Sequence, residues 1–328
     1  MKQLALVILN WNGKNLLEQF LPSVVKYSQQ AQIYVADNAS TDNSVAFLQQ
    51  HYPEIIIIQN DKNYGYAAGY NLALKKVEEP ILCLLNSDIE VTENWLTPIL
   101  NVFSEKQNVA IVQPQIADYK NKKLYEYAGA AGGFIDKYGF AYCRGRIFET
   151  LEAKNTYGSA PIFWASGACF FIKKDVFNSL QGFDTDFFAH QEEIDLCWRA
   201  YNANYQAYYC AESTVYHLGG ATLQHSNPKK TFLNFRNSLC MLAKNLPKNK
   251  LFAIIFLRLC LDGLAGVRLF FKGQFAHVWA IITSHFAFYR MLSKMLKKRN
   301  GTHKESYYGS KSIIWAYFIK NITHFSNI

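Results

Sequence analysis

The side chains best suited to chemistry are carboxylates, amides and histidines that lie far apart along the chain. Glu192, Glu193 and Asp195 form its densest acidic cluster. Crowded carboxylates raise one another's pKa, and proton abstraction requires a base with a pKa nearer neutral. Acidic residues are equally suited to a solvated helix N-terminus, where the helix dipole favours negative charge. The cluster therefore predicts either a general base or a helix start in solvent.

Asp88 and His217 are candidates for binding a metal ion or a phosphate group. Asp88 follows an apolar run, where it could bind a divalent cation that carries a diphosphate. It could instead form a turn or cap a helix that opens near residue 92. His217 ends an apolar segment and precedes a pair of glycines. A ligand role and a structural role both fit this histidine.

These residues can act together only if the fold gathers them, and the chain alternates apolar runs with helical patterns. The runs predict strands at Leu4–Leu9, Ile33–Ala36, Ile55–Gln59, Ile81–Leu85 and Ala110–Val112. The helical patterns lie between them at Lys14–Tyr27, Ser44–His51, Ala67–Val77 and Trp95–Ser104. Such alternation is typical of an α/β fold, with a mostly parallel sheet flanked by helices on both faces.

Polar side chains follow the predicted strands, and in parallel sheets the ligand crevice lies at the carboxyl ends of the strands. Asn10 and Asn12 follow the first strand, Asp37 ends the second, and Asn63 follows the third. Asp37 can accept hydrogen bonds from a base N–H or a ribose hydroxyl. Its neighbours at 38–42 are typical of a loop and a helix cap. We therefore expect the ligand at this edge of the sheet.

Two turns of small residues could bring the backbone close to a ligand. The segment Asn63–Asn71 places Gly65 and Gly69 around a helix start, where phosphate can bind. Such a glycine pair also serves helix–strand packing, which we favour for Gly69. Trp164 lies beside the turn that contains Gly167. An aromatic ring there suits stacking on a sugar or base, or packing in the core.

The segments that follow the fifth strand are less regular. Tyr119–Thr156 is rich in Gly and Tyr and predicts a loop or a hairpin insertion. Pro161–Ile172 predicts a turn and a core strand. Glu192–Ala203 predicts a helix, and Thr214–His217 predicts a strand that ends in histidine.

Composition and charge divide the chain of 328 residues into two parts. Hydrophobic residues make up 50% and charged residues 18%, which excludes global disorder. From Lys229 to the end, 17 Lys and Arg stand against two acidic residues, so the net charge of this tail is +15. The first 228 residues carry −6. We therefore expect one domain at 1–228, and at 229–328 a helical tail with an anionic partner.

The tail is apolar as well as basic, notably over Leu251–Arg290. Its longest uncharged stretch, Gly273–Tyr289, has 17 residues, and a membrane span needs about 20. We therefore expect amphipathic helices that lie on an anionic membrane surface, flanked by the basic residues at 294–299. A helical subdomain with a solvated basic face is the alternative.

Several classes of protein are disfavoured by what the sequence lacks. Seven widely spaced cysteines without a Cys-x-x-Cys motif are typical of a reducing cytosol and argue against a disulfide framework. The first residues predict a buried strand rather than a signal peptide. The basic tail has no helix-turn-helix or zinc signature, so we expect no nucleic-acid partner. No Gly-x-Gly-x-x-Gly follows the first strand, which argues against a dinucleotide-dependent dehydrogenase.

Taken in order, seven segments resemble family 2 glycosyltransferases of the GT-A fold, particularly the rhamnosyltransferase-like bacterial branch. Together they span about Leu4 to Thr222, and they are VILNWN, VADNASTD, NYGYAAGYN, LLNSDIEV, WASGACFFI, GFDTDFFAHQEEIDLCWR and VYHLGGAT. The resemblance implies an inverting transfer of a sugar from a nucleotide-diphosphate-sugar to a saccharide or lipid-linked saccharide. It also implies polysaccharide synthesis by a cytoplasmic enzyme on the inner face of the cell membrane.

The same resemblance assigns roles to individual residues. Asp37 would contact the base of the nucleotide. The other residues in the donor motifs are Asn10, Asn12, Asn63, Gly65, Asn71 and Asp88. A divalent metal, Mg²⁺ or Mn²⁺, would lie at Asp88 and His217, and Trp164 and Gly167 would form the acceptor side.

The catalytic base of the family lies in a Glu-Asp pair, whereas this chain has Glu192 and Glu193. Glu193 occupies the base position, and the choice between the two glutamates stays open. The metal-binding triplet also departs from the family, because Asn86 stands where a first aspartate is expected. Both departures leave an alternative, a catalytically inactive partner subunit that binds nucleotide-sugars within an assembly complex.

Overall fold

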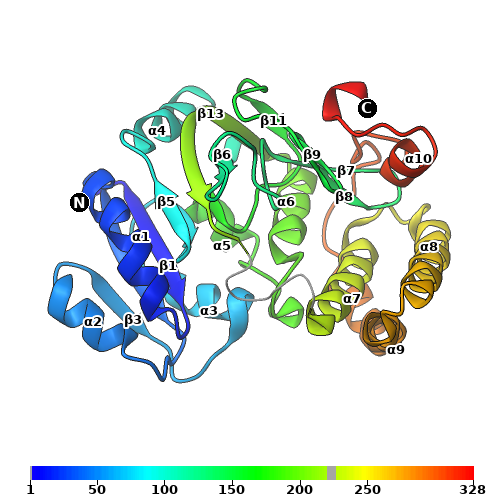
Figure 1. Ribbon diagram of the computed structural model, residues 1–328, viewed down its shortest axis with the longest axis horizontal. Coiled ribbons are helices and arrows are strands. Elements are labelled where there is room, and N and C mark those ends of the chain that lie inside the picture. The colour runs from blue at the N-terminus through cyan, green and yellow to red at the C-terminus, as the bar shows by residue number, and fades with distance from the viewer. Residues whose placement is uncertain (1, 220–226) are drawn as a thin grey trace.

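A mixed β-sheet runs through the first two thirds of the chain in a computed structural model, which describes residues 2–219 and 227–328 (Figure 1). Within these residues nine strands form the sheet, in the order β11-β13-β6-β12-β4-β1-β2-β3, with β5 beside β13. Their bounds are β1 Leu4–Asn10, β2 Ala31–Asp37, β3 Ile56–Gln59, β4 Ile81–Asn86, β5 Ile89–Val91, β6 Val109–Asp118, β11 Ala160–Ile162, β12 Cys169–Lys173 and β13 Gln206–His217.

Parallel pairing dominates the part of the sheet that was predicted from the alternating pattern. β1 is parallel to both β2 and β4, and β2 is parallel to β3. β12 is antiparallel to β4 and to β6, so it joins this half to the parallel pair β6 and β13. The predicted α/β fold with a mostly parallel sheet is confirmed.

Helices cover both faces of the sheet, because β1 is apolar on both sides. Its residues Leu4, Leu6 and Ile8 pack into one core with α1, and Ala5 and Val7 pack into a second core with α3. The helices of this part are α1 Lys14–Tyr27, α2 Ser44–His51, α3 Gly65–Leu74, α4 Leu96–Glu105, α5 Lys174–Ser179 and α6 Glu192–Asn202. The predicted bounds of α1 and α2 are confirmed, and those of α3, α4 and α6 differ by one to three residues at either end.

The expected helix start near residue 92 is wrong. Ile89–Val91 form β5, which pairs with the end of β13, and α4 begins only at Leu96. Ile89 and Val91 are buried, but a strand of three residues is too short to show a periodic pattern. Gly220 and Thr222, at the end of the seventh resembling segment, lie outside the described residues.

A small antiparallel sheet occupies the segment that was predicted as a loop or hairpin insertion. Its strands are β7 Gly133–Ile135, β8 Ala141–Cys143, β9 Arg146–Ile147 and β10 Thr150–Leu151. The Trp164 ring packs so closely on Gly133 that a Cβ there would lie 1.9 Å from a ring carbon. Glycine is therefore required where this sheet meets the main one.

The tail consists of α7 Pro228–Asn245, α8 Leu251–Phe271, α9 Phe275–Lys297 and the short α10 Ile313–Phe318. The first three lie together at one end of the molecule, and the chain then returns to the small sheet (Figure 1). There the Asp136 carboxylate accepts a hydrogen bond from the Ile313 amide at 2.9 Å. None of the helices in the described ranges has the length and apolar content needed to cross a membrane. A domain boundary at residue 228 stays a prediction.

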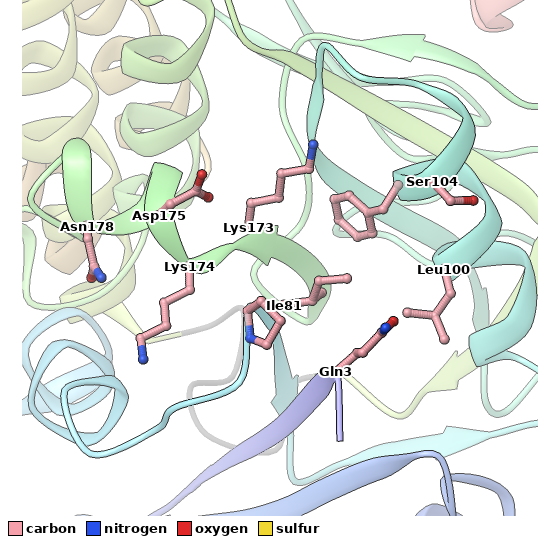
Figure 2. A pocket seen from close by; sticks show the side chains of 10 residues that line it. Gln3, Ile81, Leu100, Ser104, Lys173, Lys174, Asp175 and Asn178 are labelled. Carbon is pink, nitrogen blue, oxygen red and sulfur yellow. The ribbon is translucent and has the colours of Figure 1, made fainter. Parts of the chain in front are cut away.

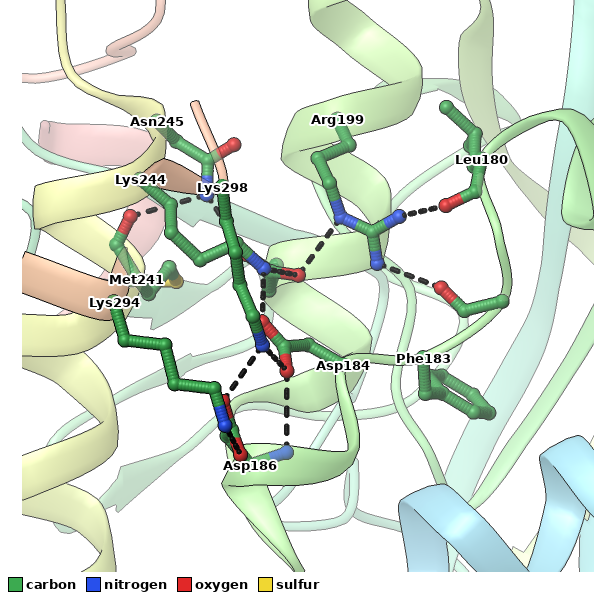
Figure 3. Close-up of polar contacts among 12 residues, drawn as sticks. Leu180, Phe183, Asp184, Asp186, Arg199, Met241, Lys244, Asn245, Lys294 and Lys298 are labelled. Carbon is green, nitrogen blue, oxygen red and sulfur yellow. Dashed lines mark hydrogen bonds and ion pairs between the residues drawn. The ribbon is translucent and has the colours of Figure 1, made fainter. Parts of the chain in front are cut away.

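Buried ion pairs join this tail to α6, as Figure 3 shows. Asp195 lies in the first turn of α6, and its carboxylate binds Arg199 at 2.8 Å, Lys244 at 2.9 Å and Asn245 at 2.9 Å. Lys244 also binds Asp184 at 2.7 Å. Burial raises the pKa of Asp184, but Lys244 and other cations outweigh it and lower the pKa to about 2. The expected alternative of a solvated helix start is wrong, because Asp195 is fully buried.

Removing the Lys244 ammonium would leave Asp184 and Asp195 without their shared counter-charge. We expect Lys244→Met to lower the free energy of unfolding by about 3–5 kcal/mol, measured by urea denaturation. The control is Lys250→Met, because Lys250 pairs with the exposed Glu305. It should cost at most about 1 kcal/mol. Equal losses in the two variants would contradict a special role for the buried pair.

Candidate active site

Asp37 lies at the carboxyl end of β2, opposite Asn10 at the end of β1. Its buried carboxylate accepts hydrogen bonds from the Ser40 amide at 2.9 Å, the Ser40 hydroxyl at 2.6 Å and the Asn10 amide group at 3.0 Å. The Oδ1 atom of Asn10 is buried without a hydrogen-bond partner among the described residues. It lies so close to Gly13 that a Cβ there would be 2.5 Å away. The loop around Asp37 is thus held in place before any ligand binds.

Asn12 supports this same loop from the side of β1. Its backbone is left-handed, with φ of 52°, and its Oδ1 accepts hydrogen bonds from the amides of Thr41 at 2.7 Å and Asp42 at 3.3 Å. These contacts fix the segment that follows Asp37. The predicted role of Asn12 in donor binding stays a prediction.

The third predicted donor segment is a cluster of amide side chains around the start of α3. The Asn38 amide group donates to the Gly65 carbonyl at 3.0 Å, and the Asn63 side chain accepts from the Gly65 amide at 2.8 Å. Gly65 has φ of +73°, and a Cβ there would lie 2.7 Å from the Phe188 ring. Its glycine is therefore needed for backbone conformation and space. Asn71 uses both ends of its amide on the backbone of Phe183, at 2.8 and 2.9 Å.

Asp88 and His217 are in direct contact. Asp88 follows the end of β4, and its Oδ1 lies 3.2 Å from Nε2 of His217 at the end of β13. Glu126 lies on the other side of the imidazole, 3.3 Å from Nδ1. All three side chains are buried. Burial lowers the pKa of His217, but Glu126 and Asp88 outweigh this effect and raise it to about 10.

These donors fit a divalent cation only in part. The carboxylate of Asp88 is a suitable ligand, and Mg²⁺ is commonly held by one or two carboxylates plus substrate phosphates. His217, with its pKa raised to about 10, would have to lose a proton before its nitrogen could bind a metal. Within residues 2–219 and 227–328, no cluster of three or more His, Cys, Asp or Glu is arranged to hold a metal ion by itself. Asp88 and His217 therefore suit a cation that arrives with a diphosphate. Sequence reasoning missed Glu126, which lies in the irregular segment rich in Gly and Tyr.

Glu192 and Glu193 begin α6, where Glu192 is buried and Glu193 is half-buried. Burial raises the pKa of Glu193 to about 7. Burial and then repulsion from Glu193 raise the pKa of Glu192 well above its usual value. In each side chain Oε2 is buried without a hydrogen-bond partner among the described residues. Glu193 therefore has the properties expected of a general base, a pKa near neutrality and an oxygen without a hydrogen-bond partner among the described residues.

The acceptor-side turn lies against this pair. A Cβ on Gly167 would lie 3.8 Å from the carboxyl carbon of Glu193, and the Gly167 carbonyl accepts a hydrogen bond from the Tyr66 hydroxyl at 2.7 Å. The ring of Trp164, which was predicted to lie on the acceptor side, is buried. Its Nε1 donates a hydrogen bond to the Phe134 carbonyl at 2.8 Å. Trp164 therefore packs against the small sheet, and contact with an acceptor stays a prediction.

Backbone contacts bring the predicted residues to one edge of the sheet. The Asn86 amide donates to the Ala168 carbonyl at 2.9 Å, which joins the end of β4 to the turn beside Glu193. The amide of Leu218 donates to the Asp88 carbonyl at 3.1 Å. β4, β1 and β2 are neighbours in the sheet, so Asp88, Asn10 and Asp37 follow adjacent parallel strands. Asn71, another predicted donor residue, has its amide group hydrogen-bonded to the backbone of Phe183 instead.

A separate cavity of about 660 Å³ lies at the opposite ends of the strands (Figure 2). Gln3 and Ile81, at the beginnings of β1 and β4, line it together with Lys173 and Lys174. None of the predicted site residues lines this cavity. In parallel sheets the ligand crevice lies at the carboxyl ends, so this cavity is not the candidate active site.

Comparisons with known proteins agree with this geometry. The low-salt glycan biosynthesis hexosyltransferase Agl10 of Haloferax volcanii is 21% identical over 239 residues, covering 71% of this chain and 73% of that protein. The N-acetylglucosaminyl-diphospho-decaprenol L-rhamnosyltransferase of Mycobacterium tuberculosis is 23% identical, covering 61% and 71%. The crystal structure of GalNAc-T7 with UDP, GalNAc and Mn²⁺ matches with a TM-score of 0.57 at 16% identity. It covers 76% of this chain and 49% of that one.

The structural likeness, at this low identity, shows the fold alone, and the fold is GT-A. The sequence model described as Glycosyl transferase family 2 matches residues 5–180, which is more than half of the chain. That range contains the strand ends with Asp37 and Asp88 and the turn with Gly167. The resemblance found in the sequence is confirmed, and the chain belongs to glycosyl transferase family 2.

Proposed function

We propose that this protein is an inverting glycosyltransferase that moves a sugar from a nucleotide-diphosphate-sugar to a hydroxyl of a lipid-linked saccharide. The observation that carries the proposal is the carboxyl pair of buried Glu192 and half-buried Glu193, with a pKa of about 7 for Glu193, beside the Gly167 turn. Names of relatives support the reaction class, because one is a hexosyltransferase of glycan biosynthesis and another is a rhamnosyltransferase. We leave the transferred group as a hexosyl or rhamnosyl unit.

In this mechanism Glu193 acts as the general base. Its free Oε2 takes the proton from the acceptor hydroxyl as that oxygen attacks the anomeric carbon. The new bond forms on the face opposite the leaving diphosphate, which departs with the electrons of the broken bond, so the configuration inverts. Glu192, with the higher pKa, stays protonated and keeps the charge of the pair on Glu193.

The donor would lie along the carboxyl edge of the sheet. Asp37, held by Ser40 and Asn10, offers its carboxylate to a base N–H or a ribose hydroxyl. A divalent ion, Mg²⁺ or Mn²⁺, would be held by Asp88 and His217, with Glu126 behind the imidazole. When bound, such an ion supplies Lewis-acid stabilisation of charge on the leaving diphosphate.

A donor screen tests the reaction class directly. Purified protein is mixed with candidate sugar nucleotides, Mn²⁺ or Mg²⁺ and a membrane lipid extract, and release of nucleotide diphosphate is measured. We expect release that depends on one donor, on the extract and on the metal. Donor binding without transfer to any extracted lipid would contradict the proposal. It would favour the alternative of an inactive partner subunit, which the single carboxylate of Asn86-Ser-Asp88 supports.

Two matched variants test which glutamate is the base. Glu193→Gln should lower kcat by about 10²–10⁴-fold, since general-base catalysis contributes that much, while donor Kd stays within a few-fold. Glu192→Gln resembles the protonated side chain that Glu192 already has, so its kcat should change by less than about tenfold. The opposite pattern would assign the base to Glu192.

The pH profile provides the control for this prediction. A base must be deprotonated to act, so kcat/KM of the wild type should fall as the pH drops through about 7. In Glu193→Gln that fall should disappear. Its persistence in the variant would mean that another group titrates.

We also propose that the acceptor is met at a membrane, on which the tail lies at the cytoplasmic face. α8 is amphipathic, but its apolar side faces outward. The exposed residues on it are Phe252, Phe256, Leu264, Val267 and Phe271. Two of its three charged residues, Arg258 and Asp262, are buried, and the third, Arg268, is exposed. Large apolar faces of this kind are typical of interaction with a membrane or another protein.

The basic residues beside this face favour an anionic bilayer over a second copy of the chain. α9 continues the exposed apolar side with Phe275, Trp279 and Phe286, and its last turns expose Arg290 and Lys294. Aromatic rings next to lysine and arginine are typical of helices that lie in the interface of anionic membranes. Two copies of a tail with a net charge of +15 would repel each other.

Vesicle co-sedimentation tests this contact. The protein should bind vesicles of phosphatidylglycerol and phosphatidylcholine more tightly than vesicles of phosphatidylcholine alone. Replacing both Phe256 and Phe271 by Ser should weaken binding at least tenfold, since burying one Phe contributes roughly 1.5–3 kcal/mol. Ile56→Ser, which removes an exposed apolar side chain on β3, is the control and should bind normally. Dimerisation through this face without vesicle binding would contradict the proposal.

A further inference from the structure

The loop that leads into α6 follows an unusual backbone path. Residues 184–191, here called the 184–191 loop, include Phe188, His190 and Gln191 with φ of 64°, 70° and 72°. The left-handed conformation is disfavoured for side chains other than glycine. Such residues persist only where surrounding contacts hold them, and they gather at functional sites. The cause of this path must therefore be sought in the elements that touch the loop.

The side chain of Asn237 in α7 hydrogen-bonds to three backbone carbonyls of this loop. It is completely buried, and its Nδ2 lies 3.0 Å from the Phe187 carbonyl, 2.9 Å from that of Ala189 and 2.7 Å from that of His190. With two hydrogens for three carbonyls, the amide must share at least one of its bonds. These contacts hold the three carbonyls around one nitrogen, which requires the reversed path of the backbone.

Arg236 fixes the orientation of this amide. Its Nε donates to Oδ1 of Asn237 at 2.8 Å, and its terminal nitrogen donates to the carbonyls of Asp186 and Phe187, both at 3.1 Å. Because Oδ1 accepts from Arg236, Nδ2 must face the loop. A hydrogen-bonded amide with both ends used gives one defined geometry.

The loop touches both halves of the candidate active site. It ends directly at Glu192 and Glu193, and the Phe188 carbonyl accepts hydrogen bonds from the amides of Tyr66 at 3.0 Å and Ala67 at 3.3 Å. Tyr66 in turn donates to the Gly167 carbonyl. A shift of the 184–191 loop would therefore move the glutamate pair relative to α3 and the acceptor-side turn.

We propose that Asn237 is a positioning residue that sets the placement and burial of Glu192 and Glu193 through the 184–191 loop. This proposal rests on the proposed function. It adds a part of the machinery that lies outside residues 5–180, the range matched by the family. The basic tail thus contributes to the reaction site through α7 as well as carrying the apolar face of α8.

Few other titratable groups lie near the glutamate pair, so few could mask an effect of Asn237 on its pKa. The titratable groups that act on its charge are Tyr66 from α3, Cys143 from β8, and Asp195 and Cys197 from α6 itself. His190 lies just before it in the loop, next to Lys230 in charge interaction. None of these side chains hydrogen-bonds to Asn237 in the described residues. Its replacement should therefore act on the pair through the path and solvation of the loop.

Asn237→Leu tests the proposal, because leucine keeps the approximate volume and removes the donors without adding charge. The matched control is Asn234→Leu, one turn earlier on α7, where the side chain makes no hydrogen bond to the loop within the described residues. We expect Asn237→Leu to lower kcat by about 10- to 100-fold, since displacement of about 1 Å can cost 10²-fold. The donor KM should stay within a few-fold in both variants.

A second readout does not depend on activity. Infrared titration of the buried carboxyls should give a lower apparent pKa for the pair in Asn237→Leu than in wild type, because opening the loop admits water. Asn234→Leu should titrate as wild type. A folded Asn237→Leu with wild-type kcat and wild-type titration would overturn the proposal, as would equal effects in Asn234→Leu.

Two further outcomes of these experiments have a definite meaning. If Asn237→Leu does not fold, Asn237→Ser, which keeps one hydroxyl donor, should show the same direction in titration, and an unshifted titration would overturn the proposal. If wild-type protein shows no transfer with any donor, the proposed function fails. The infrared comparison then still decides whether Asn237 controls the burial of the glutamates.

Discussion

Four carboxyl groups lie in and just before the start of α6, and their surroundings give two of them counter-charges and leave the other two without any. Asp184 and Asp195 share the Lys244 ammonium and keep their charge. Glu192 and Glu193 have no ion-pair partner within the described residues, so burial pushes their proton affinity upward. Removing a counter-ion from a buried carboxylate costs several kcal/mol. Lys244 of the tail thus neutralises the two aspartates and leaves the two neighbouring glutamates without a counter-charge.

The donor side depends on a different constraint, the register of the parallel strands. Asn10 faces Asp37 across β1 and β2, and Leu9 faces Asn86 across β1 and β4. This register puts the polar ends of three strands at one edge, where short loops lock Asp37 to Ser40 before a ligand arrives. Preorganised polar groups cost no reorganisation when charge develops on a bound substrate. In the proposed function the sheet edge would bind the donor, and α6 would supply the proton acceptor.

Much of this fold could be predicted from local sequence, because strands buried on both faces and amphipathic helices leave periodic patterns. Asp37, Asp88 and His217 were predicted as site residues because Asp37 and His217 end strands and Asp88 follows one. Glu126 was not found, because it lies in no strand and its place is set by tertiary contacts, such as the hydrogen bond from its amide to the Ile116 carbonyl of β6 at 3.0 Å. The burial of Asp195 was equally hidden. Its partner Lys244 lies 49 residues later, and such pairing is set by tertiary packing alone.

The composition of the tail indicated its basic and apolar character but not which of its polar residues would be buried. Its basic, apolar character indicated a membrane partner, and α8 does present its apolar side outward while Arg258 and Asp262 point inward. The neighbouring α7 uses its polar residues differently, because Asn237 is buried against backbone carbonyls before the glutamates. Lys298, directly after α9, adds an ion pair with Asp184 at 2.5 Å. These contacts connect the helices of the tail to the 184–191 loop, so the proposed membrane contact and the proposed proton transfer would depend on the same packing.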